Sequence, residues 1–297
     1  MKTLSHRAFL HQARESQEAF LERRFGEGSV QAPRVQLSRT LAANGANFVD
    51  LPVVRESLRH RFPGGWRDGL MPESPLFNDM LRSQHIPFNL FAPLISVQGT
   101  SAINTLFSEL LSCQVEEVCD IRIEHAPQEA QNLLGDNTAF DVFAELKLQD
   151  QSAAAVGVEV KYTEGSYAWG KTERQRMFDE ASEYCRITSS SGIYHPGALS
   201  TLRTPRQKQN WRNQLLGECL MQTDPRISTF WYVYLYPARS EYHHEVAKQY
   251  EKLLRKDNPK ARFLAITYED HLSVAERTVG EIDGVSWVAY ARERYLF

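Results

Sequence analysis

Two alternating segments joined by a short polar turn constrain the fold of this chain more than any other feature. Residues 139–148 and 155–163 each alternate apolar and polar side chains, and the sequence Gln149-Asp150-Gln151-Ser152 lies between them. A period of two is typical of β-strands, and a few polar residues suffice for a tight connection. The sequence therefore predicts an antiparallel β-hairpin.

The pairing within this hairpin predicts which charged side chains meet. A turn centred on Asp150 and Gln151 places Asp141 opposite residues 159–161 of the second strand. Because side chains alternate, Asp141 occupies one face of its strand, and Glu159 and Lys161 share one face of theirs. The valines between them have the opposite phase. We therefore expect a carboxylate pair with an ammonium beside it, backed by an apolar wall.

This group has a specific chemical interpretation and a simpler one. Two close carboxylates raise each other's pKa unless a cation lies between them. Carboxylate oxygens suit Mg²⁺ or Mn²⁺, and a nearby lysine can orient or deprotonate a metal-bound water, which is the chemistry of phosphodiester hydrolysis. Alternatively, the three residues form cross-strand ion pairs on a solvated face. Spacing alone leaves both interpretations open.

The rest of the chain predicts an α/β fold with a mixed sheet flanked by helices. We expect strands at 118–124, 228–236 and 262–268. We expect helices at 5–25, 103–111, 171–187 and 242–255, and another that opens with Thr204 as N-cap and Pro205 at its first position. Residues 1–80 are irregular and rich in proline, which predicts a mainly helical or irregular accessory region beside a domain spanning 81–297.

The order of these elements around Asp141 and the string Glu159-Val160-Lys161 resembles the PD-(D/E)XK superfamily of restriction-endonuclease-like nucleases, in a bacterial branch. The resemblance implies an α-β-β-β-α-β core. Phe140 stands where the motif usually has proline. Further patches between 83 and 213 carry the resemblance: Ser83 and Gln84; Phe88, Asn89, Leu90 and Phe91; Gln209, Asn210, Trp211, Arg212 and Asn213; and Tyr162, Thr163 and Glu164.

The resemblance implies a metal-dependent nuclease that hydrolyses DNA phosphodiester bonds. In that role Asp141 and Glu159 bind Mg²⁺ or Mn²⁺, and Lys161 acts at the attacking water. Some members add a glutamate from the first core helix, where Glu109 is the candidate here. DNA is the expected partner, and a homodimer that cuts two strands is a further expectation. The alternative is a non-cleaving nucleic-acid-binding or structural module with the same fold.

Charge is unevenly distributed, although the whole chain is nearly balanced, with 34 Lys and Arg against 37 Asp and Glu. Residues 97–145 contain nine acidic residues and one basic residue, and residues 184–217 contain five basic residues and no acidic one. Basic side chains hold phosphates, so the second segment predicts the DNA contact. The expected contacts are Arg203, Arg206, Lys208, Arg212 and Asn213, which can instead form surface salt bridges or hydrogen bonds.

A competing motif supports a third reading, a P-loop-like NTPase. Residues 165–172, Gly-Ser-Tyr-Ala-Trp-Gly-Lys-Thr, satisfy the phosphate-binding pattern G-x-x-x-x-G-K-[ST] between a strand and a helix. However, the strand before a P-loop is apolar on both faces, whereas this one carries Glu159 and Lys161. Bulky Tyr167 and Trp169 would also crowd a loop whose backbone wraps a phosphate.

The remaining features predict a cytoplasmic protein without a membrane partner. No apolar run of the 297 residues approaches the length of about 18 residues that a membrane span needs. The first twenty residues carry charges throughout and no apolar core of a secretory signal. The four cysteines form no C-x-x-C pair, which argues against a zinc site. His243 and His244 are expected as a surface pair on a charged helix.

Overall fold

The computed structural model describes residues 2–26, 30–31, 35–61, 74–258 and 260–297. The strands are β1 (Val30–Gln31), β2 (Gln36–Leu37), β3 (Val115–His125), β4 (Phe140–Leu148), β5 (Ala153–Val160), β6 (Ile227–Tyr236) and β7 (Ala261–Thr267). The helices are α1 (His6–Phe25), α2 (Arg39–Ala43), α3 (Pro52–Arg61), α4 (Pro75–Asn78), η1 (Ser83–His85), α5 (Ile86–Leu90), α6 (Ala92–Ile95), α7 (Ser101–Leu111), α8 (Gln128–Leu134), α9 (Lys171–Phe178), α10 (Glu183–Ser190), α11 (Leu199–Leu202), α12 (Lys208–Thr223), α13 (Glu241–Glu251), α14 (Tyr268–Thr278) and α15 (Trp287–Tyr295).

A five-stranded sheet in the order β3-β4-β5-β6-β7 forms the centre of the molecule. β3, β4 and β5 are antiparallel, while β5, β6 and β7 are parallel. The predicted mixed sheet and α/β class are therefore confirmed. The hairpin is also confirmed: Val142 pairs with Val158, and the Gln151 amide donates to the Leu148 carbonyl at 2.9 Å in the turn.

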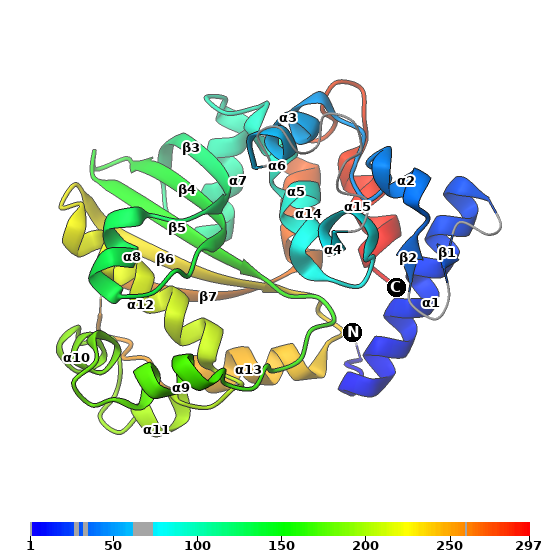
Figure 1. Ribbon diagram of the computed structural model, residues 1–297. Coiled ribbons are helices and arrows are strands. Elements are labelled where there is room, and N and C mark those ends of the chain that lie inside the picture. Colours follow the sequence, from blue (N-terminus) through cyan, green and yellow to red (C-terminus); the bar gives the residue numbers. More distant parts are fainter. Residues whose placement is uncertain (1, 27–29, 32–34, 62–73, 259) are drawn as a thin grey trace.

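Helices cover both faces of the sheet (Figure 1). Apart from Phe140, the even-numbered apolar residues of β4 and β5, such as Val142 and Val158, pack into one cluster with α1, α7, α14 and α15. Odd-numbered residues such as Phe143 face the other cluster, which contains α8, α10 and α12. The alternation therefore sends Asp141, Glu159 and Lys161 to the α12 face, where Glu159 and Lys161 contact that helix and Asp141 stays partly exposed.

The N-terminal region shares its core with the sheet and the C-terminal helix. Buried side chains of α1 and α3 belong to the same apolar cluster as the even-numbered face of β4 and β5. Arg294 of α15 is fully buried and donates to the Asn47 carbonyl at 2.7 Å and to the Gln17 Oε1 at 3.3 Å. In Figure 1 the two ends of the chain, α1 and α15, accordingly lie side by side.

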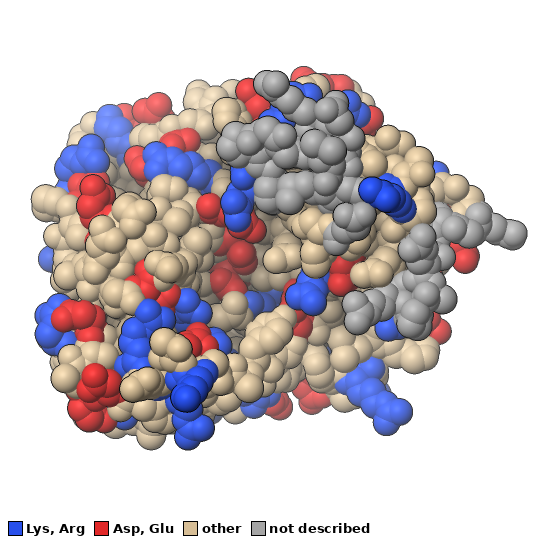
Figure 2. Space-filling model, in the orientation of Figure 1, with Lys and Arg blue, Asp and Glu red and all other residues tan. Residues whose placement is uncertain are grey.

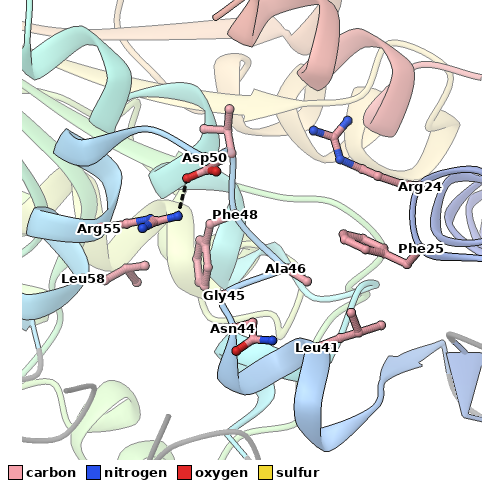
Figure 3. A pocket seen from close by; sticks show the side chains of 11 residues that line it. Arg24, Phe25, Leu41, Asn44, Gly45, Ala46, Phe48, Asp50, Arg55 and Leu58 are labelled. Carbon is pink, nitrogen blue, oxygen red and sulfur yellow. Dashed lines mark hydrogen bonds and ion pairs between the residues drawn. The ribbon is translucent and has the colours of Figure 1, made fainter. Parts of the chain in front are cut away.

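A cavity of about 280 Å³ lies within this N-terminal region, between α1, α2 and α3. Figure 3 shows the aromatic side chains of Phe25 and Phe48 and the guanidinium of Arg24 around it, and the Asp50–Arg55 ion pair at 2.5 Å. No candidate catalytic residue lines this cavity. It is therefore separate from the carboxylate pair of the hairpin.

Two helix predictions were wrong for local reasons. The helix expected over 171–187 is divided, because Asp179 Oδ1 accepts the Ala181 amide at 2.9 Å and Ser182 Oγ caps a new helix through the Cys185 amide. The helix expected from Thr204 and Pro205 begins only at Lys208. The Thr204 hydroxyl donates backward to Thr201, closing a turn instead of capping.

Within the described residues, no helix is both long enough and apolar enough to cross a membrane.

Candidate active site

The end of the β4–β5 ladder brings Asp141, Glu159 and Lys161 together. The regular pairing stops at Val142 and Val158, and the Asp141 Oδ2 accepts the next amide, that of Val160, at 2.7 Å. The carboxylate thus takes the place of a backbone acceptor where β4 begins. Lys161 lies just beyond β5, but its amide still donates to Leu235 of β6 at 2.8 Å. These backbone contacts fix where the three side chains start.

Lys161 and Glu159 form a buried ion pair. The Lys161 Nζ lies 2.5 Å from the Glu159 Oε1, and their side chains are 9% and 6% exposed. The same Nζ donates to the Gln209 Oε1, and the Tyr268 hydroxyl donates to the Lys161 carbonyl at 2.5 Å. The lysine is therefore held at both ends, with its ammonium directed at the carboxylate pair.

Helix α12 supplies two amides to this site. Gln209 and Asn213 are four residues apart, so they lie on one face of the helix. Gln209 accepts from Lys161, and the Asn213 Nδ2 donates to the Glu159 Oε2 at 2.5 Å. Asn213 is 1% exposed, so it supports the carboxylate instead of presenting a surface to DNA as expected from the sequence.

Burial and mutual repulsion perturb the charges of the group. Burial, followed by the nearby Glu159 carboxylate, raises the pKa of Asp141 well above its ordinary value. Burial would lower the pKa of Lys161, but the carboxylates of Glu159 and Asp141 outweigh that effect, and the pKa is raised. Lys161 is therefore an ammonium in the metal-free protein, and within the described residues it is the cation that pairs with Glu159.

The donor set fits a hard divalent cation. Asp141 is partly exposed, and within the described residues its Oδ1 accepts no hydrogen bond. Mg²⁺ and Mn²⁺ take one or two protein carboxylates and complete their shell with water and phosphate oxygens. In the part of the chain that the structure describes, no group of three or more His, Cys, Asp or Glu could hold an ion. Asp141 and Glu159 would therefore hold it as a pair.

Glu109, the third candidate ligand, lies elsewhere. Its Oε2 pairs with Arg277 of α14 at 2.6 Å. The preceding residue, Ser108, contacts the amide of Val115, which pairs with Leu148 at the turn end of β4. Asp141 is at the other end of that strand, about 23 Å away at the usual rise per residue. The structure does not bring Glu109 to the carboxylate pair.

The basic residues expected to contact DNA are engaged within the protein. Arg203 pairs with Glu180 at 2.8 Å, Arg206 with Glu245 at 3.0 Å, and Lys208 with Glu173 at 2.5 Å. Arg212 bridges Asp136 at 2.5 Å and Glu173 at 3.1 Å. The acid-free segment is thus neutralised by acids from other segments. Since α12 begins at Lys208, Arg203 and Arg206 also lie outside its first turn.

The P-loop-like residues 165–172 do not form a phosphate cradle. Residues 165–170 run without regular secondary structure from Lys161 to α9. The Gly170 amide, which opens the helix, donates to the Glu173 Oε2 at 3.2 Å. That carboxylate also pairs with Lys208 and Arg212. An acidic side chain therefore occupies the helix N-terminus where an anionic phosphate would bind.

Sequence reasoning missed the specific roles of several polar residues here. Glu164 accepts the Ser83 amide at 2.5 Å and the Tyr162 amide at 3.1 Å, which ties the strand end to the η1 segment. The only signal in the sequence was that Ser83, Tyr162 and Glu164 belong to the patches that carry the family resemblance.

The prediction that His243 lies at the surface was wrong. Its side chain is 1% exposed, and its Nδ1 contacts the Tyr234 hydroxyl at 2.8 Å. Burial and the nearby Lys161 ammonium lower its pKa to about 3.

Figure 2 shows one face of the molecule, in the orientation of Figure 1. The middle of the face is hollowed, with acidic atoms inside the hollow and basic side chains around it.

One comparison with known proteins decides the family. The PD-(D/E)XK nuclease superfamily matches residues 5–297, which is nearly the whole chain. The chain belongs to this superfamily. The mixed sheet flanked by helices agrees with its restriction-endonuclease-like fold. No curated protein and no solved structure matches the chain.

Proposed function

We propose that this superfamily member is a nuclease that hydrolyses DNA phosphodiester bonds with Mg²⁺ or Mn²⁺, using Asp141, Glu159 and Lys161. The observation that carries the proposal is the convergence of two carboxylates and one ammonium at the end of β4 and β5, in a chain of nuclease ancestry. The raised pKa of Asp141 supports it, because a carboxylate pair that repels itself gains from a bound cation.

Each residue has a distinct task in this proposal. Asp141 and Glu159 hold the cation, which supplies a polarised water and neutralises charge on the phosphate. Lys161 directs its ammonium to the same place, where it can offset negative charge that develops on the phosphate oxygens. Gln209 and Asn213 position the lysine and the glutamate through their hydrogen bonds.

The test is cleavage of plasmid and linear DNA with Mg²⁺, with Mn²⁺ and with EDTA. Wild type should cleave only with the metals, and Asp141→Ala and Lys161→Ala should each lose about a hundredfold or more of the rate. Glu145→Ala is the matched control, because Glu145 shares the strand and face of Asp141 but pairs with Arg122 at 3.0 Å. It should retain activity.

Equal cleavage by wild type, Asp141→Ala and Lys161→Ala would refute the proposal. Salt-sensitive DNA binding with no metal-dependent product would instead identify a non-cleaving nucleic-acid-binding module. Lys171→Ala should leave cleavage intact, because Lys171 is exposed at the start of α9 and lies outside the group formed by Asp141, Glu159 and Lys161.

A further inference from the structure

The segment that mimics a P-loop carries an exposed aromatic side chain beside the carboxylate site. Tyr167 is 48% exposed and Phe178, at the end of α9, is 40% exposed. Among the described residues, the large apolar side chains that are exposed are these two and Phe25. Single exposed rings are normal on a protein surface, so what distinguishes Tyr167 is its place in a pocket that Lys161 also lines. Two of these three side chains, Tyr167 and Phe178, lie in the segment that follows Lys161.

Tyr167 lies beside Lys161 of the proposed active site. It lines one small pocket together with Lys161, Gln209 and Arg206. Within the described part of the chain, no aromatic ring and no cation packs on the Tyr167 ring. The ring is thus placed next to the ammonium of Lys161 without a partner for its face.

Trp169 anchors the same segment. Its Nε1 donates to the Arg203 carbonyl at 3.1 Å, and the Lys208 ammonium lies 5.0 Å from its ring centroid. Phe178 meets it edge-on at 6.0 Å and has the Arg174 and Arg203 guanidinium groups 5.4 Å from its own ring. The aromatic segment is therefore fixed by Trp169 and surrounded by cations.

An exposed ring flanked by cations matches one kind of nucleic-acid contact. Aromatic side chains stack on unpaired bases, while Arg and Lys follow the backbone phosphates. The bases of an intact duplex are stacked on each other and cannot cover such a ring. Arg82 has a side chain that is 50% exposed and pairs with Asp79 at 3.4 Å. Arg206 is 30% exposed and is held by Glu245 at 3.0 Å, so a phosphate would have to displace that carboxylate.

We propose that Tyr167 stacks on an unpaired base of the substrate strand, next to the phosphate held at Asp141 and Glu159. The protein therefore prefers single-stranded DNA, or duplex DNA with a single-stranded segment, over intact duplex DNA. The inference rests on the proposed function for the identity of the ligand. It adds the substrate structure and assigns a role to the segment 165–170.

The test measures binding in EDTA, so that it does not depend on cleavage. The probe is a 20-nucleotide DNA strand containing 2-aminopurine, used alone, with a full complement, or with a shorter complement that leaves an overhang. Wild type should bind the single strand and the overhang more tightly than the blunt duplex and should quench 2-aminopurine. Tyr167→Ala should weaken single-strand binding about 5- to 100-fold and abolish quenching.

Two variants make the result specific. Tyr167→Phe keeps the ring and should bind as wild type does. Phe25→Ala removes the exposed ring of α1, which lines the separate cavity of Figure 3, and should also bind normally. Unchanged single-strand binding by Tyr167→Ala, or equal losses in Tyr167→Ala and Phe25→Ala, would overturn the inference.

The outcomes also separate this inference from the proposed function. If wild type and Tyr167→Ala cleave duplex DNA alike with Mg²⁺ and bind single strands alike, the inference fails and the proposed function stands. If Tyr167→Ala loses single-strand binding while wild type cleaves no DNA with either metal, the proposed function fails and the stacking contact stands.

Discussion

Asn213 and Gln214 are adjacent buried amides of α12, but only Asn213 has hydrogen-bond partners among the described residues. Replacing them should therefore change the free energy of unfolding in opposite directions. Asn213 donates to Glu159 at 2.5 Å and accepts from the Thr138 hydroxyl at 3.2 Å. Gln214 is fully buried, and within the described residues neither its Oε1 nor its Nε2 has a hydrogen-bond partner. Replacing each by an apolar residue of similar size therefore removes very different interactions.

The magnitudes follow from these contacts. Asn213→Leu leaves one oxygen of a buried carboxylate and one hydroxyl unpaired, at about 1.5–3 kcal/mol for the charged group and about 1 kcal/mol for the neutral one. We expect a loss of about 3 kcal/mol in the free energy of unfolding. Gln214→Met removes two unsatisfied polar atoms from the interior, and we expect a gain of about 1 kcal/mol.

Denaturation by guanidinium chloride in EDTA, followed by tryptophan fluorescence, measures both changes. The midpoint should fall for Asn213→Leu and rise for Gln214→Met, with an unchanged slope. With Mg²⁺, Asn213→Leu should also reduce DNA cleavage, and Gln214→Met should not. Equal shifts of the same sign in both variants would contradict this prediction, because burial alone would then explain them.

Three further predictions test other parts of the structure. Burial and the Glu159 carboxylate raise the pKa of Asp141, so the folded protein loses stability as the pH rises through that pKa. Asp141→Asn should therefore raise the melting temperature in EDTA by about 2 °C or more at pH 8 and by less at pH 4. Arg294→Met should cost about 3 kcal/mol in thermal or chemical unfolding, because it leaves the buried acceptors of Asn47 and Tyr290 unpaired at about 1–3 kcal/mol each. Arg292→Ala, at an exposed ion pair with Glu276, should cost under about 1 kcal/mol. At Gly217 a Cβ would overlap the Phe230 ring, so Gly217→Ala should push α12 from the sheet, cost about 1–3 kcal/mol in denaturation and lower cleavage.

The hairpin was predictable because its information is local. Alternation between 139 and 163 fixed the strands, their pairing and the shared face of Asp141, Glu159 and Lys161, and the structure has that register. The mixed sheet followed from the order of strands and helices. The distance between the three charged groups was not predictable, since it depends on how the Asp141 carboxylate replaces a ladder acceptor.

Contacts between segments far apart in the sequence could not be predicted from local hydrophobic periodicity. Whether Arg212 faces solvent or Asp136 depends on how α12 packs against α8, which no local periodicity encodes. The same holds for Asn213, whose amide meets Glu159 across 54 residues. Thr204 and Pro205 carried the composition of a helix start, but Thr204 closes the preceding turn. Charge counts along the sequence therefore overestimated the basic surface.

Anomalous diffraction from crystals of the protein soaked in Mn²⁺ tests directly whether Asp141 and Glu159 hold a cation. We expect one peak within coordination distance of a carboxylate oxygen of both Asp141 and Glu159, about 2.1 Å from each, and no such peak in Asp141→Ala. A peak at another site in a protein that cleaves DNA, or undiminished Mn²⁺-dependent cleavage with no ion between these two carboxylates, would contradict it.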